Sequence, residues 1–149
     1  MAKPDPALLD PARYPFHCAV ATRFGDLDIN MHLNNVALLG IIEDARVRFN
    51  HASGFFQATP HHSSRAGITT MVASLAIEFL DQAYYPQPLD AHVAVAHIGR
   101  TSYVVQQLIK QEDRIVSFAQ SVMVCVTDGQ PTAIPAAFID GIARWRLRP

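Results

Sequence analysis

The side chains best suited to chemistry are concentrated in one short segment, residues 26–35. This segment contains two aspartates, one histidine and two adjacent asparagines: Asp26, Asp28, His32, Asn34 and Asn35. It leads into an uncharged run, Val36–Ile42, that reads as the beginning of a helix. The free amides and partial positive charge at a helix start attract a carboxylate or a developing oxyanion. The segment is therefore either a helix cap or a catalytic site, and its residue types fit both.

The helix that would position this segment is predicted from apolar residues spaced by three and four. One face contains Val36, Leu39, Ile42, Ala45 and Phe49, widened by Leu38 and Ile41. Asn34 or Asn35 supplies an amino-terminal cap, and Gly54 supplies a stop. Because the first half of this helix is apolar nearly all round, we expect it to be enclosed on several sides.

Five further segments have the alternation of strands. They are 16–23, 69–79, 89–98, 103–109 and 116–126, the last with Val116, Phe118, Val122, Val124 and Val126 on one face. Short turn-like links favour antiparallel neighbours. Residues 138–146 have helical spacing, and 1–15 read as an extended lead-in. The order predicts one α+β domain over 1–149, in which an antiparallel five-stranded sheet wraps around one long central helix.

Composition excludes several classes of protein. The chain has 149 residues and a net charge of −1, so it has no basic surplus for nucleic acid. It has no apolar run near the ~20 residues of a membrane span and no signal-peptide pattern at its amino terminus. Cys18 and Cys125 are lone cysteines in apolar stretches, which favours small buried side chains in a reducing cytoplasm. Only 17% of the residues are charged, which indicates an oligomer.

Three blocks of the sequence resemble the hotdog-fold acyl-CoA thioesterases of the 4-hydroxybenzoyl-CoA thioesterase family. The first is Asp26-x-Asp28-x-x-x-His32-Leu33-Asn34-Asn35, followed by Glu43-Asp44-Ala45-Arg46; the second is Val72–Phe79 with Ile98–Tyr103; the third is Asp128–Pro131 with Ile134-Pro135. The resemblance covers residues 14–140 in the expected order. It implies a hotdog fold and the hydrolysis of an acyl-CoA to a free acid and coenzyme A.

The resemblance also assigns site residues. By position, Asp28 matches the catalytic carboxylate, with Asp26 second, and the backbone amides near Asn34 and Asn35 match the donors to the thioester carbonyl. The residues placed to meet the nucleotide end of coenzyme A are Arg100, Thr101 and Ser102. The family's usual tyrosine and glycine are Leu38 and Met31 here, so we expect a reshaped acyl pocket.

Thioester hydrolysis needs an activated water or a nucleophile, together with stabilisation of the oxyanion. A carboxylate can act as general base on water, or attack directly to give a mixed anhydride that water opens. Both routes remain open for Asp28. No cofactor is expected apart from coenzyme A as part of the substrate, and no metal site is expected.

Other polar residues have a simpler interpretation. His32 is either a proton shuttle or a helix-cap residue, with the structural role favoured. Glu43 could share the catalytic work, but an ion pair with Arg46 or Arg48 is favoured. His61 and His62 lack a third ligand at suitable spacing and read as a solvated loop.

Two other functions on the same scaffold remain open. Asp28-x-Asn30-x-His32 is similar to part of the signature of hotdog hydratases acting on enoyl thioesters, although the histidine lies one place early. A non-catalytic acyl-CoA-binding module is the other. The resemblance further implies subunits that pair side by side with sites at their interface. We therefore expect a homodimer or homotetramer and an inactive monomer.

Overall fold

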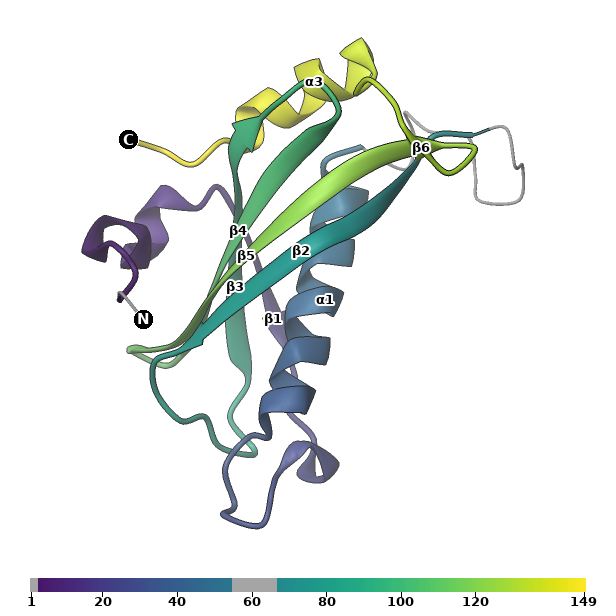
Figure 1. Ribbon diagram of the computed structural model, residues 1–149. Helices are drawn as coiled ribbons and strands as arrows, with labels where there is room; N and C mark the ends of the chain where they lie inside the picture. Colours follow the sequence, from purple (N-terminus) through teal and green to yellow (C-terminus); the bar gives the residue numbers. More distant parts are fainter. Residues whose placement is uncertain (1–2, 55–66) are drawn as a thin grey trace.

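The computed structural model describes residues 3–54 and 67–149, and it shows one antiparallel sheet curled around one long helix (Figure 1). The strands follow the order β1-β3-β4-β5-β2, and β6 pairs with β5. The elements are β1 (Phe16–Val20), α1 (Asn35–Ala52), β2 (Thr69–Phe79), β3 (Leu89–Ile98), β4 (Ser102–Gln111), β5 (Arg114–Thr127), β6 (Gln130–Pro131) and α3 (Ala136–Ile142). This architecture confirms the predicted α+β hotdog fold.

The central helix has the predicted position and ends. Asn34 is its cap, because its side-chain oxygen accepts a hydrogen bond of 2.7 Å from the Val36 amide. Gly54, just beyond the last turn, has a φ of 81°, a conformation that glycine adopts without strain. The helix therefore begins and ends where the local chemistry of these residues requires.

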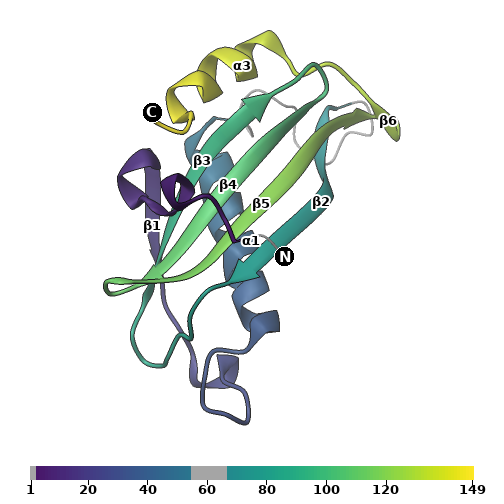
Figure 2. The same cartoon turned by 60° about the vertical axis from the view of Figure 1, so that its left-hand side comes forward.

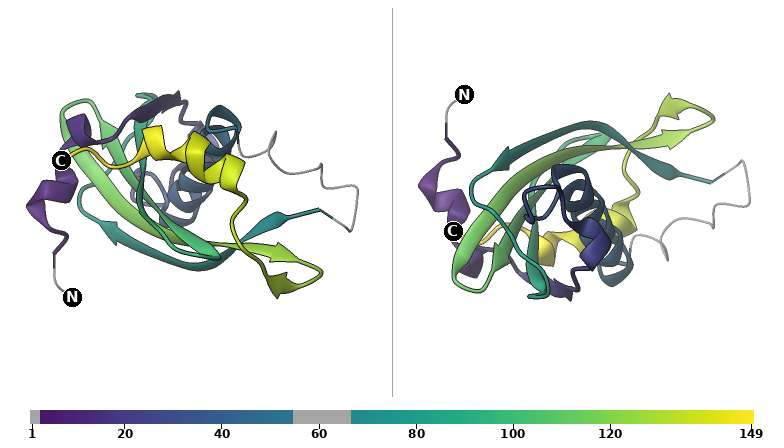
Figure 3. Two further views of the ribbon diagram at one scale, coloured as in Figure 1. Left: turned by 90° about the horizontal axis from the view of Figure 1, so that it is seen from above. Right: turned by 90° about the horizontal axis from the view of Figure 1, so that it is seen from below.

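One side of α1 is buried against the concave face of the sheet, as the view from below shows (Figure 3). The buried apolar residues follow the helical repeat: Leu38, Ile41, Ile42, Ala45 and Phe49. Gln107 of β4 is fully buried beneath the helix, and its amide nitrogen donates to the Ile42 carbonyl at 2.7 Å. The sheet thus holds the helix by packing and by this hydrogen bond.

The prediction that the first half of α1 is enclosed on several sides is wrong for the single chain. Val36 remains 75% exposed and Leu39 39% exposed. The neighbouring strand β2 is at the edge of the sheet, and it also leaves Met71, Val72 and Leu75 exposed. Of these, Leu39, Val72 and Leu75 line one groove between α1 and β2, which we call the α1–β2 face.

The apolar face predicted for β5, apart from Val116, is the one turned away from α1. On this strand the buried residues of the second half are Ser121, Met123 and Cys125, whereas Val122 and Val124 are only half-buried. Phe118 packs on the other face of the sheet. Apolar residues occupy both faces of β5, so alternation alone could not tell which face meets the helix.

The amino-terminal segment explains the second apolar face. It is not extended as predicted; it forms two 3-10 turns, Pro6–Leu9 and Pro11–Arg13, each capped by the aspartate before it. These turns lie on the face of the sheet opposite α1 (Figure 2). There Tyr14 packs with Leu108 and Phe118.

The carboxyl-terminal residues close one end of the molecule. As predicted, residues from 138 onward are helical, in α3 and a following 3-10 turn, Ala143–Trp145. Phe138 and Ile142 join the core beside Phe49. None of the described helices is long and apolar enough to cross a membrane.

The two cysteines are free thiols, as predicted. Cys125 is buried and Cys18 half-buried. Burial raises the pKa of both thiols. Both side chains therefore behave as small apolar groups rather than as reactive thiolates.

The packing of the amino-terminal segment can be tested at Tyr14, whose hydroxyl donates to the Leu8 carbonyl at 2.7 Å. We expect Tyr14→Phe to lower the free energy of unfolding by about 1 kcal/mol, since it removes one hydrogen bond. Tyr14→Ala also removes the ring and should cost about 3 kcal/mol. Urea denaturation measures both; an unaffected Tyr14→Ala variant would show that the segment does not cover the sheet.

Candidate active site

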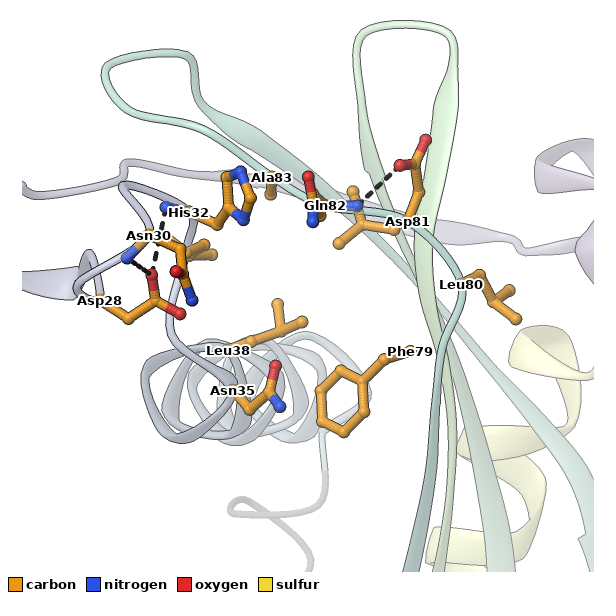
Figure 4. A pocket seen from close by; sticks show the side chains of 12 residues that line it. Asp28, Asn30, His32, Asn35, Leu38, Phe79, Leu80, Asp81, Gln82 and Ala83 are labelled. Atoms are coloured by element: carbon orange, nitrogen blue, oxygen red, sulfur yellow. Dashed lines mark hydrogen bonds between the residues drawn. The ribbon is translucent and has the colours of Figure 1, made fainter.

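A pocket of about 350 Å³ lies where the amino end of α1 meets the carboxyl end of β2 (Figure 4). One wall is the segment that the sequence singled out, with Asp28, His32 and Asn35. The opposite wall is residues 79–83, which follow directly from β2. Leu38 forms part of the apolar floor.

Asp28 presents one free carboxylate oxygen to this pocket. Its Oδ1 accepts backbone hydrogen bonds from Asn30 at 2.8 Å and from His32 at 3.4 Å. The second oxygen points toward the space above Leu38 and Asn35 (Figure 4). One oxygen therefore fixes the side chain, and the other is available for chemistry.

Asp26, the second candidate for the carboxylate, has a structural role. It is buried, and its two oxygens bind the amide of Arg23 at 2.9 Å and the guanidinium of the same residue at 3.1 Å. Its carbonyl accepts from the Asn34 amide at 2.8 Å. It lines a different hollow, with Ala37 and Gly40, so its carboxylate does not reach the Asp28 pocket.

The first turn of α1 offers one unused amide to the pocket. The Asn34 amide is bound to Asp26, and the Val36 amide is bound to the Asn34 side chain. The Asn35 amide has no partner among the described residues, and Asn35 lines the pocket. No acidic residue in the first turn opposes the positive end of the helix. A developing negative charge would be stabilised at this point.

His32 lies between the two walls. Its backbone carbonyl accepts from the Asp28 amide at 2.9 Å, which closes the turn. Its ring meets that of Tyr84 edge to face, with 5.3 Å between centroids. The imidazole faces the pocket beside Asp28, so the histidine combines a structural backbone role with an accessible side chain.

The turn between Asp28 and His32 requires a left-handed residue. Met31 has a φ of 61°, and its amide donates to the Asp28 carbonyl at 3.0 Å. This conformation costs an ordinary L residue about 1 kcal/mol or more. The position therefore favours glycine, and Met31 accepts the strain with an exposed side chain.

The opposite wall contains polar residues that sequence reasoning missed. Asp81 and Gln82 line the pocket, and Tyr84 packs behind them. The Gln82 amide and the Arg114 guanidinium hold the pKa of Asp81 below its usual range. The sequence offered only their position as a sign that these residues belong to the site. They follow β2, and in this topology the end of β2 lies near the start of the helix.

The structure does not bring Arg100, Thr101 and Ser102 into the pocket. Arg100 and Thr101 lie in the turn between β3 and β4, and Ser102 begins β4. Ser102 pairs with Val124, which in turn pairs with Met71 near the beginning of β2. The pocket lies at the other end of that strand, so about 30 Å of sheet separates the two groups.

Two other candidates lie outside the pocket. Glu43 forms an ion pair with Arg46 at 3.6 Å, and Arg48 pairs instead with Asp44 at 2.8 Å. The ion pair with Arg46 agrees with the structural role favoured for Glu43. Glu43 faces a separate groove along α1 and β2. His61 and His62 lie outside the described residues. Across the residues that are described, no three metal-ligating side chains gather at one place.

The curled sheet around one helix, with a pocket at the helix start, defines the class as a hotdog-fold protein. Solved structures support this class. The PA5185 protein of Pseudomonas aeruginosa superposes with a TM-score of 0.80 at 21% identity, covering 92% of this chain and 95% of that one. A thioesterase of Thermus thermophilus, complexed with coenzyme A and zinc, gives a TM-score of 0.77 at 24% identity, covering 92% and 98%. The probable thioesterase YbaW of Escherichia coli gives 0.73 at 20%, covering 87% and 97%.

The sequence profile of the Thioesterase-like superfamily matches residues 22–145. The chain therefore belongs to this superfamily and is an enzyme of the thioesterase class. The match does not single out 4-hydroxybenzoyl-CoA as the substrate. No curated protein sequence matches the chain.

The strained turn gives a test of the site's local geometry. We expect Met31→Gly to raise the free energy of unfolding by roughly 0.5–1 kcal/mol, because relief of the left-handed strain outweighs the added freedom of the unfolded chain. Met31→Ala keeps the Cβ and should give no such gain. Thermal or urea unfolding compares the two variants; equal effects would contradict a left-handed residue 31.

Proposed function

We propose that the protein hydrolyses acyl-CoA thioesters, with Asp28 as the catalytic carboxylate. The observation that carries the proposal is the free Asp28 oxygen facing the pocket (Figure 4) that is also lined by Asn35, whose backbone amide is unused. The similar Thermus thermophilus thioesterase is complexed with coenzyme A, which supports the choice of carrier.

The two groups supply the two requirements of thioester hydrolysis. The Asn35 amide, at the positive end of α1, donates to the thioester oxygen as negative charge develops on it. Asp28 takes a proton from a water molecule, whose oxygen forms a bond to the carbonyl carbon. Collapse of the tetrahedral intermediate breaks the carbon–sulfur bond, and the proton passes to the departing thiolate. The products are a free acid and a thiol.

A covalent route uses the same atoms. The free Asp28 oxygen attacks the carbonyl carbon, the thiolate leaves, and water opens the resulting mixed anhydride. Single turnover in ¹⁸O-labelled water, followed by mass analysis of the peptide containing Asp28, tests for the covalent route. Label in the carboxylate indicates an anhydride that water opens at the aspartyl carbon; label only in the free acid is produced by the general-base route and also by an anhydride opened at its acyl carbon.

The proposed assembly is a homodimer that pairs through the β2 edges, with a tetramer as a dimer of such dimers. The exposed apolar residues of the α1–β2 face indicate a surface that a partner covers. A second copy of the chain would complete the enclosure that the first half of α1 lacks.

This assembly would also unite the two halves of the site. Antiparallel pairing about a two-fold axis places the Thr69 end of one β2 beside the Phe79 end of the other. The Arg100 turn lies at the Thr69 end and the pocket at the Phe79 end. Each pocket would then take Arg100, Thr101 and Ser102 from the partner, where Arg100 pairs with a phosphate of coenzyme A.

The free thiols favour the reducing cytoplasm as the compartment.

The role of Asp28 is tested with a panel of acyl-CoAs and a thiol reagent. We expect Asp28→Asn to lower kcat about 10²- to 10⁴-fold while the fold and ligand binding remain, since it removes the base or nucleophile. Asp26→Asn should instead lower the melting temperature and spare kcat. Undiminished turnover by Asp28→Asn excludes the assignment, and hydration of crotonyl-CoA without thiol release excludes the reaction.

The shared site is tested by complementation between two variants. Asp28→Asn and Arg100→Ala are each expected to have low activity at substrate concentrations below KM. A purified heterodimer of the two contains one intact site of two and should recover about half of the wild-type rate. If both residues acted within one chain, no intact site would form and the heterodimer would stay as inactive as its parents.

A further inference from the structure

The wall of the pocket opposite Asp28 contains a side-chain amide, that of Gln82, whose orientation is set by a hydrogen bond. The Tyr84 hydroxyl donates to Gln82 Oε1 at 3.1 Å. An amide whose oxygen is occupied in this way turns its nitrogen, with two donor hydrogens, to the other side. Figure 4 shows this nitrogen on the side of the pocket interior, beside His32 and across from Asp28.

Tyr84 is itself held from behind by β4. The buried side chain of Gln111 accepts from the Tyr84 amide at 2.8 Å and donates to the Tyr84 carbonyl at 2.6 Å. Both backbone groups of the tyrosine are therefore bound to one side chain. The position of Tyr84 is set by the sheet and not by the turn it belongs to.

Arg114, at the start of β5, fixes the same segment at a second point. Its guanidinium lies over the Tyr84 ring, 5.3 Å from the centroid, and donates to the Gln82 carbonyl at 2.8 Å. It also bonds to Gln111 Oε1 at 3.3 Å. One cation thus contacts the backbone of Gln82, the ring of Tyr84 and the side chain that holds Tyr84.

The ring of Tyr84 has one further contact, the edge-to-face contact with His32. The tyrosine therefore touches two polar side chains of the pocket, Gln82 on the wall opposite Asp28 and His32 beside Asp28. It does so without lining the pocket itself. This arrangement requires several side chains to be ordered, which costs conformational entropy. Its result is a hydrogen-bond donor held at a fixed place in the pocket.

We propose that Gln82 is a substrate-binding residue whose Nε2 donates to a carbonyl oxygen of the bound thioester, and that Tyr84 is the positioning residue that orients it. The ligand chemistry is a neutral carbonyl acceptor, in the acyl group or in the amide-containing arm of the carrier thiol. A carboxamide NH₂ and a partly exposed pocket suit a neutral acceptor. This inference rests on the proposed thioester hydrolysis at the Asp28 pocket.

The test is a double-mutant cycle on acyl-CoA hydrolysis. Gln82→Met removes the donor and keeps the length of the side chain, and we expect kcat/KM to fall about tenfold. Tyr84→Phe removes only the hydroxyl and keeps the ring on His32 and under Arg114; we expect a threefold to tenfold fall. Because the tyrosine acts through Gln82, the double variant should be no slower than Gln82→Met alone.

Two measurements separate positioning from a general structural effect. The loss should appear as a raised KM with kcat little changed, since the donor binds substrate and not only the transition state. Tyr85→Phe is the matched control: its ring packs on Phe24 outside the pocket, and its kinetics should match the wild type. The melting temperatures of the wild type, the three variants of the cycle and the Tyr85→Phe control should agree closely, because the side chains concerned are exposed.

Each outcome has a definite meaning. Additive losses in the double variant, or a Tyr84→Phe variant as efficient as the wild type, overturn the assignment of Gln82 and Tyr84 and leave the proposed hydrolysis standing. Failure of the wild type to release thiol from any acyl-CoA overturns the proposed function, and this inference with it.

Discussion

The burial of one side of α1 in the concave face of the sheet is the interaction on which the rest of the structure depends. Each large side chain of the buried stripe, such as Leu38, Ile42 or Phe49, contributes about 1.5–3 kcal/mol when it leaves water. Their sum is comparable with the whole stability of an ordinary domain. Because the stripe and the Gln107 bond fix the helix along the sheet, they also fix the place of its amino end. The geometry of the candidate site follows from that place.

Local patterns in the sequence were sufficient to predict the central helix and the five long strands, because each of these elements follows from residues within it. Apolar residues repeating every 3.6 or 2.0 positions located α1, β2 and β3. The Asn34 cap could be predicted because its side chain binds the amide of Val36, two residues along the chain. The faces could not be predicted in the same way. Val122 and Val124 of β5 are as apolar as the residues that meet the helix, and the pattern does not tell which face α1 covers and which face the amino-terminal turns pack on. That cover is a contact between residues about a hundred positions apart.

The candidate site shows the same division between local and distant information. The segment 26–35 was identified from its composition, but the choice between its two aspartates depends on their partners. Arg23 neutralises Asp26, whereas Asp28 is held by backbone amides that leave one oxygen free. The polar residues of the opposite wall had no motif at all. They are brought to the pocket because β2 ends where α1 begins, a consequence of the sheet order that no short pattern carries.

The two walls of the pocket are supported by different parts of the molecule, and in the proposed function this separates the reaction from the recognition of substrate. The wall with Asp28 and the Asn35 amide is tied to the helix start, so a change there alters the burial of α1. On the helix, the pocket-lining residue Leu38 belongs to the core and offers no hydroxyl. The polar contacts therefore fall to His32 and to the segment after β2. That segment is anchored by Gln111 and Arg114 at the β4–β5 end of the sheet. Side chains such as Gln82 can thus change without disturbing the helix, and in the proposed role of Gln82 substrate binding can change while the position of the Asp28 carboxylate stays the same.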